Sequence, residues 1–297
     1  MAYDEIEKSY TVAYGNMITM LSQQTQSMLE SCVTVKPGIV GKQAVAADQI
    51  GRFQFVDAKE RFEDTPLFDI QRERRWYEYI MKKGGVPLDD IDVLRTTLDP
   101  KTAIVQAGMA GVNRAKDKEI LRGYYATNKI GELGEKTVDF KASNIIANDY
   151  ASGDVLKQLN HAIELFKQQD VDYANEEVYC VVNSVMATKL REAGVYITND
   201  TMGGTVLTGK KLVPYAGINF VELEDVPWRK EGSSDIIYSL PIFCKSGVGL
   251  GKWQDTKVRV GELQSKSYAW HIYMQFALGA SRLEEAKCLS LEVKKSA

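Results

Sequence analysis

The amino-acid pattern predicts an α+β fold, and three segments carry that prediction. From Tyr268 to Gly279, large apolar residues alternate with small or polar ones, which is the period of a β-strand with one covered face. Asp99-Pro100 pairs a preferred N-cap with proline at the first helical position, so a helix should run from there to about Tyr125. Beyond about residue 150, helical and strand patterns alternate along the chain.

The composition is that of an ordinary soluble globular protein. Of the 297 residues, 44% are hydrophobic and 26% are charged, and the length suggests one or two domains. The formal net charge of -3 argues against a dedicated nucleic-acid binder, which would be basic. The N-terminus is acidic and no apolar run is long enough to span a bilayer, so neither a secretion signal nor membrane insertion is expected. The cysteines lack metal-ligand spacing and are expected to be buried free thiols: Cys32, Cys180, Cys244 and Cys288.

Residues 1–31 form a polar segment with a helical pattern near its end. Ile18, Leu21, Met28 and Leu29 recur at helical spacing beside an uncharged polar face. An arm that docks on a neighbouring subunit has this pattern, and so does a frayed terminus.

Residues 32–90 are charged along most of their length and have few large apolar side chains. Strand-like patterns stand near the two ends, at Cys32–Val35 and Arg75–Ile80. Aromatic residues such as Phe53 and Trp76 argue against simple disorder. We therefore expect a projecting two-stranded arm, and because an isolated hairpin is only marginally stable in water, the arm should lie on another chain.

Basic and acidic side chains are equally numerous in this arm and form separate clusters. The candidate contact residues between subunits are Glu60, Glu63, Asp64, Arg72, Arg74, Arg75 and Trp76. In a head-to-tail assembly the arginine cluster of one copy can meet the acidic cluster of the next. The alternative is that these side chains are solvated on both faces of a hairpin.

The helix expected at about 100–125 has an unusually small face. Gly108 and Gly111 lie three residues apart among alanines, which predicts close approach by a neighbouring element. Arg114 and Asp117 are also three apart and can pair on one face of the helix.

The remaining pattern predicts a compact mixed domain. We expect a helix capped by Ser152, a buried strand at Val178–Val182, a short helix from Asn183 or Ser184 that Gly194 ends, and a strand-like ending at Cys288–Val293. Further strands are expected at about 210–213, 217–223, 235–244 and 256–262. The stretch at about 128–150 has no clear period and is expected to be a hairpin or loop.

No residue pattern points to catalysis, a cofactor or a metal site, so no enzyme activity is expected. His161 and His271 are isolated and are interpreted as structural. Asp89, Asp90 and Asp92 lack EF-hand spacing and are interpreted as a solvated loop. The glycine-rich stretch at 247–252 departs from a phosphate loop and is expected to be a turn between strands.

Three stretches in order resemble the major capsid proteins of tailed bacteriophages, which have the Hong Kong phage capsid fold. They are "ERFEDTPLFDIQRERRWYEYI" at 60–80, "LDPKTAIVQAGMAGVNRAKDKEIL" at 98–121, and "YAWHIYMQFALGASRLEE" at 268–285. The resemblance implies an N-terminal arm at 1–31, an extended loop at 32–90, and an axial domain at 151–255. It also implies a peripheral domain at 91–150 and 256–297, built on the spine helix at about 100–125 and the long C-terminal strand.

The resemblance implies a structural protein of the virion, assembled in the host bacterial cytoplasm. Its copies would form hexamers and pentamers of an icosahedral shell around double-stranded DNA, which they would contact weakly. Expected partners are other copies of the chain, a separate scaffolding protein, a portal and cement or decoration proteins, with no membrane. The alternatives are the shell of an encapsulin-like protein compartment and an enzyme of unrecognised class.

Overall fold

The structure is a computed structural model that describes residues 23–51, 55–57, 67–70, 72–88, 101–192, 212–231, 235–266 and 269–295. The chain divides into two compact units, each made of three segments. The first comprises Met1–Gln26, Met81–Arg114 and Thr256–Phe276, and the second Ser27–Ile80, Ala115–Asp255 and Ala277–Ala297. The mixture of helices and sheets confirms the predicted α+β class.

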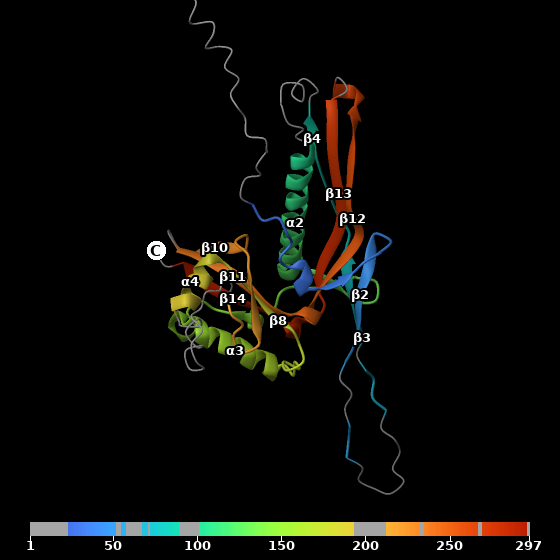
Figure 1. The fold of residues 1–297 in the computed structure, drawn as a ribbon. Helices are drawn as coiled ribbons and strands as arrows, with labels where there is room; N and C mark the ends of the chain where they lie inside the picture. The colour runs from blue at the N-terminus through green and yellow to red at the C-terminus, as the bar shows by residue number, and fades with distance from the viewer. Residues whose placement is uncertain are drawn as a thin grey trace, which may run out of the picture. The chain divides into compact units, whose positions relative to one another are not determined.

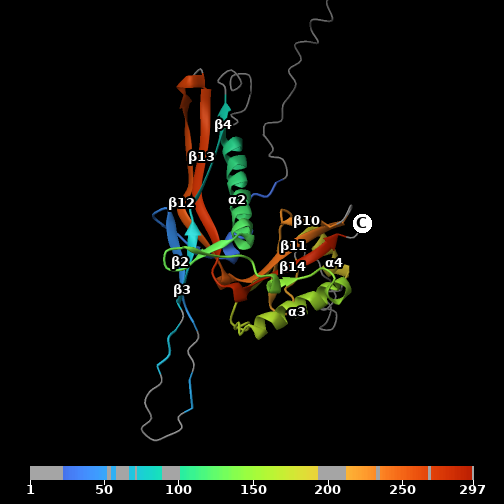
Figure 2. The same ribbon diagram turned by 180° about the vertical axis from the view of Figure 1, so that it is seen from behind.

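One long helix and three long strands make up the first unit and continue into the second. They are α2 (Lys101–Tyr125), β4 (Ile80–Leu88), β12 (Val248–Leu263) and β13 (Ala269–Arg282). α2 runs alongside β13 and β4 (Figures 1 and 2). The strands are hydrogen-bonded in the order β1-β12-β13-β4, where β1 is Thr34–Lys36. The predicted helix and the predicted alternating strand are thus both confirmed.

The alternation in β13 places its apolar side chains in the core. Ile272 and Met274 are buried, as the period-2 pattern requires. A Cβ added to Gly108 would lie 2.5 Å from the Sδ atom of Met274, so this glycine does allow the close approach that the small helix face predicts. A Cβ on Gly111 would meet only Nη2 of Arg114, at 3.8 Å. Gly111 therefore has room for a methyl group within its own chain.

The second unit contains a six-stranded sheet with the order β7-β14-β11-β8-β9, and β10 also pairs with β11. The strands are β7 (Ile145–Ile146), β8 (Val178–Val182), β9 (Ile218–Glu222), β10 (Trp228–Glu231), β11 (Asp235–Cys244) and β14 (Cys288–Lys295). Helices α3 (Val155–Gln168) and α4 (Ser184–Glu192) pack beside it through residues such as Leu159 and Leu190, which are fully buried. All four cysteines are free and buried, as expected.

A second, smaller sheet has the order β2-β3-β5-β6. Its strands are β2 (Gln43–Ile50), β3 (Arg72–Glu78), β5 (Asn128–Ile130) and β6 (Lys136–Val138). β2 and β3 are antiparallel and form the base of the extended loop (Figure 1). Short 3-10 turns lie at Glu30–Cys32, Ala142–Asn144, Tyr150–Gly153, Lys245–Gly247, Gln264–Lys266 and Glu285–Lys287.

Several local expectations are wrong. The cap of α3 is Asp154, whose carboxylate accepts the backbone N–H of Leu156 at 3.0 Å, and not Ser152. The partner of β3 is Gln43–Ile50, an alanine-rich strand that has no strong hydrophobic pattern, whereas Thr34–Lys36 pairs in parallel with β12.

The expected turn at 247–252 is also wrong. The backbone turns at Lys245–Gly247, and β12 begins directly afterwards. Gly249 and Gly251 lie in this strand, where the absence of a side chain leaves room for Tyr77. The described residues 212–214 are not a strand, and Gly194 lies outside the described residues.

A glycine that the sequence pattern did not single out allows the closest approach between α2 and β13. A Cβ on Gly123 would collide with the backbone carbonyl of Ala280, which cannot move aside as a flexible side chain can. Similarly, a Cβ on Gly279 would collide with the carbonyl of Glu78. These two positions hold the backbones of three elements of the second unit in contact.

We predict opposite effects from the same substitution at two glycines of α2. Gly123→Ala should lower the free energy of unfolding by about 1–3 kcal/mol, because the added methyl group overpacks a backbone contact. Gly111→Ala should raise it by up to about 1 kcal/mol through helix propensity alone. Denaturant unfolding of the two variants checks this, and equal effects would show that the contact at Gly123 is not tight.

Candidate assembly surfaces

The carboxylate of Asp117 on α2 holds the N-terminal segment of the same chain. Asp117 is 2% exposed and accepts three hydrogen bonds. The donors are the hydroxyl of Ser27 at 2.6 Å and the backbone N–H groups of Met28 at 3.0 Å and Leu29 at 3.1 Å. These hydrogen bonds attach residues 27–29, the first residues of the second unit, to α2. We call residues 27–36 the strap.

In the first unit, Arg114 of α2 likewise binds residues of the N-terminal segment. Its Nη1 donates to the side-chain oxygen of Gln23 at 2.6 Å and to the carbonyl of Gln24 at 3.3 Å. Asn113 donates to the carbonyl of Thr25 at 2.8 Å. The described part of the N-terminal arm therefore lies on its own helix, while residues 1–22 fall outside the described part of the chain.

Glu30 fastens the strap to two other elements. It accepts from Lys116 of α2 at 3.0 Å and also from Lys252 of β12. Burial raises the pKa of Glu30, but the hydrogen bonds from Lys252 and Lys116 outweigh that effect and leave its pKa below the ordinary value. The ion pairs of Glu30 thus connect the strap to both α2 and β12.

Arg75 lies in a buried ion cluster instead of on the surface. It is 5% exposed, and its Nη1 donates to Glu285 at 3.2 Å. Arg282 is fully buried and binds the same carboxylate with its Nε, at 3.1 and 3.0 Å from the two oxygens. Glu285 therefore pairs with both arginines, and Arg75 also lies 3.5 Å from Glu73. Burial removes Arg75 from the exposed arginine cluster that the sequence pattern predicts.

The other residues of that cluster have separate environments. Arg74 is paired with Asp48 across the hairpin at 2.6 Å, and both side chains are partly exposed. Arg72 is exposed and lies opposite Ile50. Trp76 donates to the carbonyl of Gly131 at 2.8 Å. The acidic partners that the sequence pattern suggests, Glu60, Glu63 and Asp64, lie outside the described residues.

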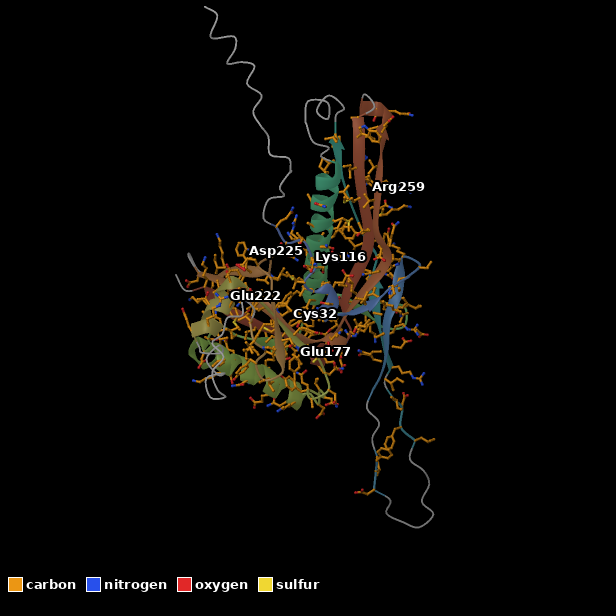
Figure 3. The ribbon with its side chains drawn as sticks, in the orientation of Figure 1. Cys32, Lys116, Glu177, Glu222, Asp225 and Arg259 are labelled. Carbon is orange, nitrogen blue, oxygen red and sulfur yellow. The ribbon has the colours of Figure 1, made fainter. Side chains whose placement is uncertain are left out.

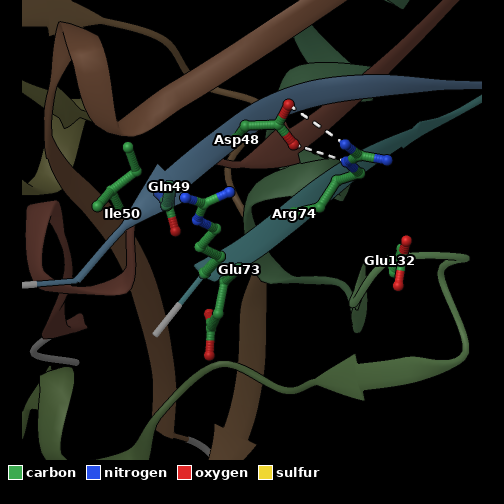
Figure 4. A pocket seen from close by; sticks show the side chains of 7 residues that line it. Asp48, Gln49, Ile50, Glu73, Arg74 and Glu132 are labelled. Carbon is green, nitrogen blue, oxygen red and sulfur yellow. Dashed lines mark hydrogen bonds and ion pairs between the residues drawn. The ribbon is translucent and has the colours of Figure 1, made fainter. Parts of the chain in front are cut away.

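Acidic and basic residues together line a shallow groove at the base of the hairpin. Its lining comes from β2, β3 and the β5–β6 turn, as Figure 4 shows: Asp48, Gln49, Ile50, Arg72, Glu73, Arg74 and Glu132. The dashed lines between Asp48 and Arg74 mark the ion pair, which leaves Arg72 as the exposed cation of the groove. Such a groove suits a charged protein segment better than a small apolar ligand.

Large apolar side chains are exposed along both legs of the extended loop. Leu67 is 94% exposed, and Ile50, Phe55, Val56 and Phe68 are exposed as well. A soluble monomer rarely leaves such a group of apolar residues in water. These side chains are therefore the strongest sign of a protein–protein contact on the chain.

Each of the two histidines packs against a neighbouring residue of its own chain. His161 stacks on Tyr150 with ring centroids 4.3 Å apart, and His271 lies against Gly85. Among the residues that the structure describes, no group of three potential ligands could hold a metal ion. No helix within these residues is long and apolar enough to cross a membrane.

A search of the solved structures finds this architecture in phage capsids. The capsid structure of the cyanophage P-SCSP1u has a TM-score of 0.70 at 14% identity, covering 98% of this chain and 95% of that chain. The capsid of Ralstonia phage GP4 has a TM-score of 0.73 at 11% identity, covering 97% and 96%. The capsid of a native GTA (gene transfer agent) particle has a TM-score of 0.68 at 12% identity, covering 96% of each chain.

The family follows from a second comparison. The family model described as "Phage capsid protein" matches residues 6–295, so the chain belongs to the phage capsid protein family. No curated protein matches the chain. The predicted resemblance and the predicted capsid fold are confirmed, and the chain is a structural component of a capsid.

We predict that the strap loosens in acid because of Glu30. A carboxylate whose folded-state pKa is depressed stabilises the fold above its unfolded-state pKa, and this contribution is lost as the pH falls through the folded-state value. Hydrogen-exchange protection of residues 27–36, corrected for intrinsic rates, should therefore decline below about pH 4.3.

The variant Glu30→Gln isolates this contribution, because Asp117 remains in both proteins. At pH 7 its strap protection should be lower by about fivefold, the scale of 1 kcal/mol, and should change less with pH. Identical pH profiles for the two proteins would contradict the assigned role of Glu30.

Proposed function

We propose that the chain is the major capsid protein of a tailed phage, and that its copies form hexamers and pentamers of an icosahedral shell around double-stranded DNA. The family match and the capsid fold support the shell. The observation that carries the proposal is the group of exposed apolar side chains on the extended loop, above all Leu67 at 94% exposure. In the shell, the neighbouring copy would cover these side chains.

The charges of the loop would set the direction of this contact. Arg72 stays exposed at the loop base, and Arg74 is held in place by Asp48. A head-to-tail arrangement would bring Arg72 of one copy to the acidic stretch containing Glu63 and Asp64 of the next. Exposed pairs contribute only about 0–1 kcal/mol each, but a ring repeats each contact.

Contact with the packaged DNA would be weak and without sequence preference. The net charge of -3 leaves no excess of cations to neutralise many phosphates. Further partners under this proposal are a scaffolding protein, a portal and decoration proteins, with assembly in the host bacterial cytoplasm. The family match favours this proposal over a cellular, encapsulin-like compartment.

The purified protein should sediment as rings or closed shells, and two loop variants should stop this without unfolding the subunit. Leu67→Asp removes apolar contact area, and Arg72→Glu reverses the exposed charge. Both should keep the far-UV spectrum and melting temperature of the parent protein while remaining monomeric in sedimentation and electron microscopy.

The matched control is Val40→Asp, which places the same charge on another apolar residue, 89% exposed and between β1 and β2, ahead of the hairpin base that β2 and β3 form. It should assemble as the parent does. A parent protein that stays monomeric under all ionic conditions, with or without scaffold, would refute the proposed function.

A further inference from the structure

Among the strands that the structure describes, β10 has one edge without a partner strand, and it carries an exposed tryptophan. β10 is antiparallel to β11, with Trp228 opposite Tyr238 and Glu231 opposite Asp235. Within the described part of the chain, no strand pairs with the other edge of β10, which lies at the margin of its sheet (Figure 1). Such an edge presents backbone N–H and C=O groups that another chain can pair with.

The exposed tryptophan belongs to a small apolar patch. Directly opposed residues of an antiparallel pair share one face, so Trp228 lies beside Tyr238, and Lys230 beside Ile236. Trp228 is 57% exposed, and Tyr238 and Ile236 are half-buried. Farther along the same face of β11, Leu240 is fully buried, so the exposed part is confined to the β10 end. Tryptophan and tyrosine are the residues most often found at the centres of protein interfaces.

Charges of both signs flank this patch. Three exposed acids lie close together in sequence: Glu222 ends β9, and Glu224 and Asp225 follow in the turn to β10. Figure 3 labels Glu222 and Asp225. β10 itself contributes Arg229, bound to Glu292 at 2.9 Å, and Lys230. Asp225 already pairs with Lys118 at 2.7 Å, and Glu224 accepts the backbone N–H of Ser184 at 2.8 Å. Within the described residues, Glu222 and Lys230 take part in no ion pair, so these two can serve a partner.

The charge order on β10 argues against a symmetric pair of these edges. If two copies of β10 joined antiparallel in register, Trp228 would face Glu231 of the other copy, and Arg229 would face Lys230. Two cations directly opposite each other destabilise a strand pair. A head-to-tail contact avoids this, because the basic strand of one copy meets the acidic end of β9 in the next, and a rotation between copies closes such contacts into a ring.

We propose that the β10 edge, with Trp228 at its centre, is a contact between neighbouring copies in a ring, in which Lys230 meets Glu222 of the next copy. The proposal rests on the proposed shell function, since it needs an assembled ring. It adds a second contact surface, on the compact sheet and separate in sequence from the extended loop.

Hydrogen exchange of the unmodified protein provides the first test. The peptide covering residues 226–231 should become protected when free subunits assemble into rings or shells. Unchanged exchange of this peptide in assembled particles would overturn the proposal even though the shell function holds. Failure of the parent protein to assemble would instead refute the proposed function itself.

Charge exchange provides the second test, with subunit folding checked by thermal melting. Lys230→Glu and Glu222→Lys should each raise the protein concentration needed for assembly about tenfold, and combining them should restore assembly. Trp228→Ser should act in the same direction without rescue by either charge variant. The matched control is Lys157→Glu, at a lysine of α3 whose side chain is 67% exposed, and it should assemble normally. Normal assembly of Lys230→Glu and Trp228→Ser, or no rescue in the charge-exchanged double variant, would overturn the proposal.

Discussion

The second unit depends on one buried carboxylate, that of Glu285. Arg282, at the end of β13, binds it with Nε and uses its other nitrogens to donate to the carbonyls of Ala126 at 2.8 Å and Val138 at 3.1 Å. Arg75, from the base of the extended loop, reaches the same carboxylate. The end of α2, the β5–β6 hairpin, the loop base and the turn before β14 are thus joined through a single acid. A buried charge is tolerated only when it is paired and hydrogen-bonded, so none of these elements can move independently at low cost.

This constraint gives the base of the extended loop a defined geometry. The base is fixed by Arg75 and by the packing of Tyr77, which is 1% exposed. The strap adds a second fixed point through Asp117 and Glu30. Elements held in this way can present exposed apolar side chains, such as Leu67, without collapsing onto their own subunit. Preorganised contact surfaces reduce the conformational entropy lost on association, which favours a repeating assembly.

The elements with strong local signals could be predicted from the sequence. Asp99-Pro100 and the following residues predict a helix that the structure gives as Lys101–Tyr125, and the alternation from Tyr268 predicts β13. β2 gives no such signal, because its alanines form no strong hydrophobic pattern. The three neighbouring arginines predict a basic surface patch, whereas Arg75 is buried against Glu285, which lies 210 residues away in sequence. No local pattern encodes such a contact, and the same holds for Gly123 against Ala280.

The role of Glu285 can be measured directly by denaturant unfolding of Glu285→Ala beside the control Glu284→Ala. Glu284 is the neighbouring acid, 45% exposed, and pairs with Lys287 at 3.3 Å. If Glu285 joins the elements of this unit, its loss leaves Arg282 without its anion and Arg75 with only the longer contact to Glu73, at 3.5 Å. The loss should therefore lower the free energy of unfolding by about 3–5 kcal/mol. The control should lose about 0–1 kcal/mol. Equal losses in the two variants would contradict the central place given to this carboxylate.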